Sequence, residues 1–178
     1  RDIRNRLNRR FLHGKNNTSY VGLSADKFVN GIYLESLGIP TPKIIALLRN
    51  KQVFFRNNLT TPSPLESLNE LPSMKVVCKG VLGGSGRDII MLEIKNKQIW
   101  MNDKKVTHKD LSQYLNGDYV LQEYVVQHSK LNQISPSALM TLRIVTTMSS
   151  GEPQIVAGAV RVGVFGKKVD NWHAGGLL

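Results

Sequence analysis

The chain has 178 residues, of which 41% are hydrophobic, so it can bury a core and its length allows one or two domains. It contains no apolar run near the roughly 20 residues that span a bilayer, and no signal-peptide pattern opens it, which excludes a membrane-spanning helix. Its single cysteine, Cys78, excludes an internal disulfide and a cysteine-based metal site, and favours a reducing, cytoplasmic setting. Because the chain starts with Arg1 and ends on an apolar leucine pair, we expect it to be a piece of a longer protein.

The charge is strongly basic, because 24 Lys and Arg residues against 13 Asp and Glu residues give +11. Residues 1–15 hold six basic residues and one acidic residue, and Ile3, Leu7 and Phe11 recur at helical spacing. This pattern predicts an amphipathic helix with a basic face, which suits an anionic lipid or nucleic-acid surface or an acidic partner elsewhere in the protein. The chain lacks the stacking aromatics and RNA-binding signatures of a nucleic-acid module. We therefore expect no nucleic-acid partner and leave peripheral membrane contact through residues 1–15 open.

The sequence of the first half of the chain predicts a helix, then two strands joined by a turn, and then a loop. Ser24 is placed to cap a helix over residues 25–38, which Gly38 ends. Residues 43–55 are expected to form a strand, a turn and a second strand. The polar, proline-rich stretch 57–73 is expected to be a loop with one short helical turn.

From Met74 onward the pattern changes to short strands. Thr107 and Asp110 have the spacing of a capping box, which predicts a short helix between two groups of strands. Two of the strands are joined by KNK as a hairpin, and the last two are joined by the turn-like SSGE. The expected strands are MKVVCKG (74–80), DIIMLEI (88–94), KQIWMND (97–103), DYVLQEYVVQ (118–127), SALMTLRIVTTM (137–148) and PQIVAGAVRVGVF (153–165).

A glycine-serine loop lies between the first two of these strands, in the stretch CKGVLGGSGRDIIMLEI. Its glycines lack Cβ atoms, so backbone N–H groups can approach an anion closely, as in phosphate-binding loops. An ordinary hairpin connection explains an isolated GGSG equally well. The P-loop pattern is absent, and the dinucleotide fingerprint fails because Ile89 stands where its last glycine should be. A glycine-rich loop between two antiparallel strands favours a lid that folds over phosphates.

Charged side chains interrupt several otherwise apolar strands. Lys79 precedes the loop, Glu123 lies in a later strand, and Arg143 and Arg161 lie in the last two strands. A cation in an apolar strand is costly unless its charged group reaches water or an anion. If the last two strands are antiparallel neighbours, we expect both guanidinium groups on one face, directed at a common anion. An edge-strand lysine and a buried Glu–Arg pair are the structural alternatives.

Five segments, taken in order, resemble the ATP-grasp superfamily, and they are most similar to its sugar-transfer-associated or glutamate-ligase-like group. The segments are DKFVNGIYLESLGIPTP, VVCKGVLGGSGRDIIML, YVLQEYVVQHSKL, SALMTLRIVT and KVDNWHAGG. The resemblance covers residues 24 to 178. Its specific parts are the stretch from Gln127 to Arg143 and the VDN…GG ending, whereas the glycine loop alone is not specific.

This resemblance implies an α+β, ATP-grasp fold, in which an antiparallel-sheet lid subdomain and part of a second α+β subdomain hold ATP between them. It implies a division into four parts. These are a basic N-terminal helical segment (1–23), the N-terminal part of the ATP-grasp domain (24–73), the lid with its glycine-rich loop (74–121), and the hinge with the start of the C-terminal subdomain (122–178).

The resemblance also implies roles for individual residues, with ATP and Mg²⁺ as cofactors. Arg143 matches a basic residue that stabilises the transferring γ-phosphate, and Arg161 is a second, catalytic helper. The nucleotide-binding residues comprise the lid-strand lysine, the loop, the hinge and a histidine after the hinge: Lys79, Gly83, Gly84, Ser85, Gly86, Arg87, Gln122, Glu123, Tyr124, Val125 and His128.

Asp170 and Asn171 carry oxygen atoms of the kind that Mg²⁺ prefers, although an Asx turn explains the pair as well. The family's metal-binding acidic residues and asparagine come later than Leu178. The resemblance therefore places Asp170 and Asn171 on the substrate side and leaves the metal ligands unassigned.

The implied chemistry is attack of a carboxylate on the γ-phosphate of ATP, followed by opening of the acyl phosphate by an amine. The expected partners are thus ATP, a small-molecule carboxylate and an amine acceptor. The family label suggests a role in polysaccharide or cell-envelope synthesis. We expect the full-length protein to be such a ligase and this stretch alone to be inactive. A non-catalytic nucleotide-binding or regulatory relative, and a basic nucleic-acid or membrane-surface module, stay open as alternatives.

Overall fold

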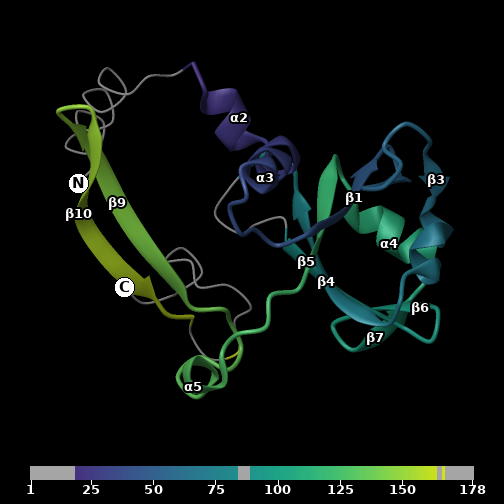
Figure 1. Ribbon diagram of the computed structural model, residues 1–178. Helices are drawn as coiled ribbons and strands as arrows, with labels where there is room; N and C mark the ends of the chain where they lie inside the picture. Colours follow the sequence, from purple (N-terminus) through teal and green to yellow (C-terminus); the bar gives the residue numbers. More distant parts are fainter. Residues whose placement is uncertain (1–18, 84–88, 164–165, 167–178) are drawn as a thin grey trace, which may run out of the picture. The chain divides into compact units, whose positions relative to one another are not determined.

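The computed structural model describes residues 19–83, 89–163 and 166 (Figure 1). These residues form two compact units, of which the first comprises 19–83 with 90–123 and the second includes 124–163. The helix expected in residues 1–15 lies outside the described residues. Within the described ranges, none of the helices combines the length and the apolar character that crossing a membrane requires.

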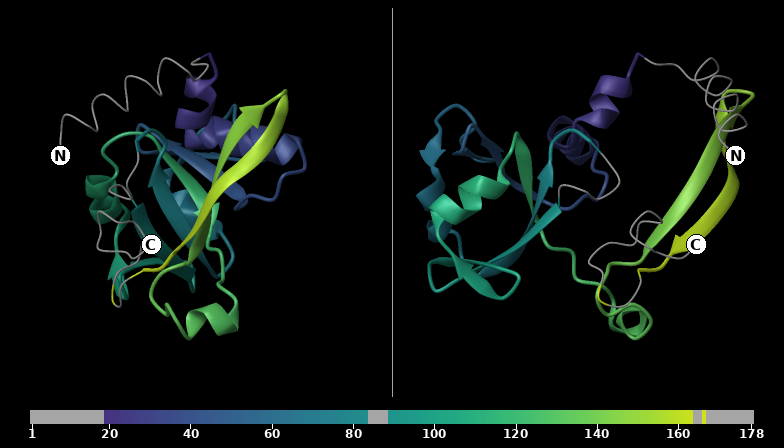
Figure 2. Two further views of the ribbon diagram at one scale, coloured as in Figure 1. Left: turned by 90° about the vertical axis from the view of Figure 1, so that its left-hand side faces the viewer. Right: turned by 180° about the vertical axis from the view of Figure 1, so that it is seen from behind.

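The first unit is built on one curved sheet (Figures 1 and 2). Its eight strands lie in the order β3-β2-β1-β8-β4-β5-β6-β7. The strand pairs with a described register are antiparallel. The strands are β1 (Ile44–Arg49), β2 (Gln52–Phe55), β3 (Ser63–Pro64), β4 (Met74–Gly80), β5 (Ile89–Lys95), β6 (Gln98–Met101), β7 (Lys104–Val106) and β8 (Tyr119–Glu123). They confirm the strands expected in this part of the chain, except that β8 ends at Glu123. They also add β3, which lies in the stretch 57–73 expected to be a loop, and β7; both are too short to give a strand pattern.

Three hairpins of this sheet turn through two residues that both have positive φ. The pairs are Asn50-Lys51 (51° and 60°), Asn96-Lys97 (52° and 57°) and Asn102-Asp103 (51° and 62°). This is the type I′ geometry, whose twist matches that of the flanking strands. Asparagine tolerates positive φ better than most residues, so it fixes the register of each of these hairpins.

Two short helices, α2 (Val21–Ala25) and α3 (Lys27–Ser36), precede the sheet. They replace the single helix expected over residues 25–38. Helix α3 is followed by Gly38 as predicted, because Gly38 has a φ of +71° and its N–H donates to the carbonyl oxygen of Glu35 at 2.9 Å.

The cap of α3 is Asp26, which corrects the expectation that Ser24 caps this helix. One carboxylate oxygen of Asp26 accepts hydrogen bonds from the N–H groups of Phe28 and Val29, each at 2.9 Å. Ser24 lies inside α2 and donates its hydroxyl to a carbonyl within that helix. A carboxylate forms stronger, charge-assisted bonds with helix N–H groups than a hydroxyl does.

Strand β8 is buried on both faces because helices cover both sides of the sheet. On one side, Tyr119 and Leu121 join the larger core, which includes buried residues of the 3₁₀ helix η1 (Leu65–Glu70) and of α4 (His108–Tyr114). On the other side, Val120 packs in a smaller cluster beneath α3; its other members are Ile44, Leu47, Val81, Phe28, Ile32 and Phe54. The sheet therefore has an α3 side and an α4 side.

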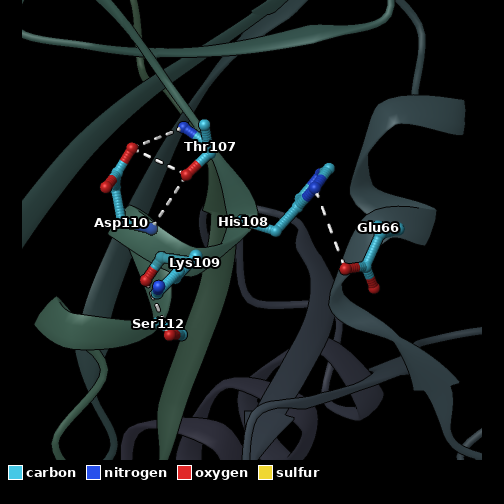
Figure 3. A network of polar contacts seen from close by, with 6 residues as sticks. All are labelled: Glu66, Thr107, His108, Lys109, Asp110 and Ser112. Atoms are coloured by element: carbon cyan, nitrogen blue, oxygen red, sulfur yellow. Dashed lines mark hydrogen bonds and ion pairs between the residues drawn. The ribbon is translucent and has the colours of Figure 1, made fainter.

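Helix α4 begins with the predicted capping box (Figure 3). The hydroxyl oxygen of Thr107 accepts from the N–H of Asp110 at 3.1 Å, and an Asp110 carboxylate oxygen accepts from the N–H of Thr107 at 3.0 Å. His108 Nδ1 lies 3.9 Å from a carboxylate oxygen of Glu66, which places α4 beside η1 on the larger core.

The second unit contains a short helix, α5 (Ser129–Asn132), and a long hairpin of β9 (Thr141–Ser149) and β10 (Glu152–Arg161). The two strands are antiparallel and turn at Ser150-Gly151, which confirms the predicted strand pair and its connection. Helix α5 has only four residues, too few to give a helical pattern in the sequence.

Candidate nucleotide-binding site

Lys79 lies on the α3 side of the sheet. It is in β4, directly opposite Val120 of β8, and cross-strand partners share a face. Val120 packs beneath α3, so Lys79 points to the same side. Its side chain is half-buried, and no hydrogen bond or ion pair to it is found among the described residues. The first unit thus holds a cation that the rest of the described chain does not neutralise.

Burial lowers the pKa of the Lys79 ammonium group below 10.5, and the nearby charge of Lys27 lowers it further. Both causes reflect the free-energy cost of keeping a positive charge at this position. An anion placed against Lys79 would offset that cost. The electrostatics of the position therefore favour a negatively charged ligand.

Lys27, the first residue of α3, binds the segment that leads into the glycine loop. Its ammonium group donates to the carbonyl oxygens of Gly80 and Gly83 at 2.9 Å and 2.8 Å, and its backbone N–H donates to that of Val81 at 3.0 Å. A cation in the first turn of a helix is disfavoured by the positive partial charge there, so these carbonyls supply a needed compensation. Lys27 therefore fixes the start of the loop next to Lys79.

Sequence reasoning missed this contact. The available signal was the Asp-Lys pair at the start of α3, where a capping carboxylate is followed by a lysine in the unfavourable first turn.

Of the predicted loop residues, the structure describes Gly83. It is exposed and has a φ of +97°, a conformation that glycine adopts without strain. The remaining predicted loop residues, Gly84, Ser85, Gly86 and Arg87, lie outside the described residues.

Two residues of the predicted hinge end strand β8 and face opposite sides of the sheet. Gln122 is opposite Val77, two residues before Lys79, so it lies on the α3 side, whereas Glu123 lies on the α4 side. The Gln122 side chain is 7% exposed, and its amide donates to the carbonyl oxygen of Pro42 at 3.3 Å. Gln122 therefore ties β8 to the segment before β1, and this contact uses one of the two N–H donors of its side-chain amide.

The boundary between the two units falls between Glu123 and Tyr124, inside the predicted hinge segment. Tyr124 and Val125 belong to the second unit and are each 41% exposed. His128 is also exposed, and its Nδ1 accepts from the backbone N–H of Lys130 at 3.2 Å, so it caps α5. His128 therefore has a structural contact within its own segment, which is separate from the nucleotide-binding role expected for it.

Arg143 and Arg161 lie on the same face of the β9–β10 hairpin, as expected. Arg161 is paired with Thr141, and Arg143 lies two residues after Thr141 on the same side of β9. The two arginines are thus diagonal neighbours, a relationship that separates Cα atoms by about 7–8 Å. Two guanidinium groups at this spacing can hold one anion of the size of a phosphoryl group.

The opposite face of the hairpin is apolar. It carries large side chains that are exposed in the second unit: Leu142, Ile144, Met148, Ile155 and Val160. The hairpin is therefore amphipathic, and its polar face carries both arginines.

The described residues offer no group of three or more His, Cys, Asp or Glu side chains that would hold a metal ion. Asp170 and Asn171 lie outside the described residues. At the start of the loop lie the ammonium groups of Lys79 and Lys27 and a glycine with positive φ, which are groups of the kind that bind anions in proteins.

A family model described as sugar-transfer associated ATP-grasp matches residues 6–178, which include the described parts of both units. No curated protein and no solved structure matches the chain.

Proposed function

Because the chain belongs to the sugar-transfer associated ATP-grasp family, we propose that Lys79 and the adjoining glycine loop bind the phosphates of ATP. Family membership implies an ATP-dependent, ligase-type function and an α+β ATP-grasp fold. The observation that carries the proposal is that the ammonium group of Lys27 binds the carbonyl oxygen of Gly83, where the loop begins, with the half-buried cation of Lys79 nearby. Lys79 contacts a phosphate directly, and Lys27 holds the loop that covers it.

The second unit contributes the residues that act on the transferring group. Arg143 and Arg161 bind the γ-phosphoryl oxygens, and they stabilise negative charge as it develops during transfer. Their shared face supports this role, because guanidinium groups bind phosphate oxygens in a fixed, planar geometry. Asp170 and Asn171 belong to the substrate side of the site.

The proposed reaction joins a carboxylate to an amine. A carboxylate oxygen attacks the γ-phosphorus of ATP, ADP leaves, and an acyl phosphate forms. The amine nitrogen then attacks the acyl carbon, phosphate leaves, the nitrogen loses a proton, and an amide remains. Mg²⁺, which ATP-grasp proteins generally use, would neutralise charge on the phosphates when bound.

We also propose a role for each range of residues and a cellular location for the protein. Residues 24–73 begin the ATP-grasp domain, residues 74–121 form the lid, and residues 122–178 form the hinge and the start of the C-terminal subdomain. The basic residues of 1–15 are available for peripheral membrane contact. The carboxylate and amine belong to polysaccharide or cell-envelope synthesis, and the protein is cytoplasmic. The buried thiol of Cys78, the chain's only cysteine, is compatible with that setting.

Calorimetric titration with Mg-ATP tests the binding part of the proposal. We expect saturable binding that ADP competes for and that changes little between about 0.1 M and 0.3 M salt. A basic surface module would instead bind polyanions without preferring ATP, and its affinity would fall steeply over that salt range. If Mg-ATP binds but the full-length protein, given carboxylates and amines together, releases no ADP, the protein is a nucleotide-binding relative, and the ligase part of the proposal is wrong.

A further inference from the structure

The side chain of Gln127 makes two hydrogen bonds to the backbone of the segment that precedes β9. Its amide nitrogen donates to the carbonyl oxygen of Ser135 at 2.9 Å, and its amide oxygen accepts from the N–H of Met140 at 2.5 Å. Met140 directly precedes β9, the strand that carries Arg143. Gln127 thus fixes the point at which that strand starts.

The side chain of Ser135 extends this network toward β10. Ser135 is 2% exposed, and its hydroxyl donates to the carbonyl oxygen of Ala138 at 2.9 Å, with the carbonyl oxygen of Gly163 at 3.5 Å. Gly163 comes two residues after Arg161, the last residue of β10. Beyond it, the N–H of Gly166 donates to the hydroxyl of Ser137 at 3.0 Å. The segment before β9 is therefore tied to the segment after β10.

These contacts lie at the open end of the hairpin, opposite the turn at Ser150-Gly151. Thr141 pairs with Arg161 at this end, and Arg143 is two residues away. At the other end the turn joins the two strands covalently, whereas at the open end only non-covalent contacts hold them together. Both arginines thus lie where the hairpin depends most on the Gln127–Ser135 network.

We propose that Gln127 and Ser135 are positioning residues that hold Arg143 and Arg161 in place for anion binding. This inference rests on the function proposed above for the two arginines. The amide of Gln127 suits the role because its two contacts need opposite polarity: a donor toward the Ser135 carbonyl and an acceptor for the Met140 N–H. An ionised carboxylate of the same shape supplies acceptors only, and it faces the Ser135 carbonyl without a proton to share.

The first test compares Gln127→Glu with Gln133→Glu, which makes the same charge change at an exposed position in the same segment. The readout is the NMR signals of the arginine side-chain Nε–Hε groups, recorded without ligand, together with the melting temperature. Gln127→Glu should shift the signals of Arg143 and Arg161 near pH 7, and the shift should reverse as the introduced carboxyl group is protonated. Ser135→Ala should shift the same two signals, and Gln133→Glu should leave them unchanged.

The second test measures Mg-ATP affinity by calorimetry in a double-mutant cycle. Gln127→Glu should weaken binding about tenfold in the otherwise unchanged protein, on the scale of a lost hydrogen bond, and should have no further effect in the Arg143→Ala background. If the arginine signals stay unchanged while the melting temperature falls, or if the loss of affinity persists without Arg143, the positioning role is wrong. If Arg143→Ala alone leaves the affinity unchanged, the proposed function of Arg143 fails, and the NMR comparison still decides the role of Gln127.

Discussion

The ammonium group of Lys27 donates a 2.8 Å hydrogen bond to the carbonyl oxygen of Gly83, a residue 56 positions later in the chain. This contact joins the start of α3 to the start of the glycine loop and places a second positive charge beside Lys79. The contact fixes the position of Gly83, the first glycine of the loop, on the α3 side of the sheet.

Replacing Lys27 by methionine should therefore weaken Mg-ATP binding about tenfold, because the loop start loses its charged hydrogen-bond donor. The free energy of unfolding should fall by about 1 kcal/mol for the same reason. Calorimetry and denaturant unfolding measure the two effects. Lys109→Met is a matched control, since Lys109 is an exposed lysine in the first turn of α4. Equal losses in the two variants would contradict a specific role for Lys27.

The lowered pKa of Lys79 predicts a characteristic pH dependence. Below both its folded and its unfolded pKa, Lys79 is charged in the folded and unfolded states, so the cost of the half-buried charge is present in full. Between its folded pKa and 10.5 the unfolded state binds more protons, so the free energy of unfolding gains a contribution as pH rises through that range. Mg-ATP favours the charged form, so its affinity should fall as the pH rises through the pKa of Lys79 in the free protein.

Lys79→Arg should remove that alkaline loss of affinity, because the guanidinium group stays charged throughout the range. Titrations with Mg-ATP between pH 7 and about 10 compare the two proteins. A loss of the same size in Lys79→Arg would assign the pH dependence to other groups.

The packing of α3 on β1 depends on Gly31. A Cβ atom at this position would lie 2.7 Å from Cδ1 of Ile44, a side chain that is buried in the smaller core. We expect Gly31→Ala to destabilise the protein by about 1 kcal/mol, because overpacking outweighs the gain in helix propensity. Gly22→Ala in α2 meets nothing within 4 Å, so it should be neutral or stabilising. Denaturant unfolding measures both, and a stabilised Gly31→Ala would show that Ile44 rotates away freely.

The capping box of α4 sets the ionisation of Asp110. Hydrogen bonds from the hydroxyl and the N–H of Thr107 lower the pKa of Asp110 below 3.8. Since the folded pKa is the lower one, this contribution to stability is present above the ordinary pKa and is lost as pH falls through the folded value. Thr107→Ala should raise the pKa of Asp110 toward 3.8 and destabilise the protein by about 1 kcal/mol.

An NMR titration of the Asp110 carboxyl carbon and denaturant unfolding check these two effects. Thr61→Ala, at an exposed threonine in a loop, is the control and should change neither. An unchanged pKa of Asp110 in Thr107→Ala would contradict the assigned hydrogen bonds.

Much of the fold follows from local sequence signals. The strands predicted in the first unit, the Thr107–Asp110 capping box and the β9–β10 hairpin each depend on residues that are close in sequence, and they are confirmed, whereas the short strands β3 and β7 were not predicted. The cap of α3 is an instructive error, because Ser24 and Asp26 are both good capping residues and only the interruption between α2 and α3 decides for Asp26.

The contacts of the candidate site are harder to predict from the sequence than the secondary structure, because they join segments that are distant in the chain. Lys79 stands out as a cation in an apolar strand. The Asp-Lys pair at the start of α3 signals that Lys27 needs compensation, but no local pattern identifies the carbonyls of Gly80 and Gly83 as its partners. Likewise, the family resemblance includes the stretch from Gln127 to Arg143, but nothing in the sequence shows that the side chain of Gln127 contacts Ser135 and Met140. Such contacts depend on the tertiary fold, which periodicity and residue propensity do not encode.

Calorimetric titration of Mg-ATP into Lys79→Ala and Lys75→Ala tests the central claim most directly. Lys75 is an exposed lysine on the same strand, four residues earlier, so the two variants remove the same charge from the same strand. Lys79→Ala should weaken binding at least about tenfold, on the scale of one charged hydrogen bond, while Lys75→Ala should bind as the unmodified protein does. Saturable binding that is equally strong in both variants would contradict the placement of the ATP phosphates at Lys79.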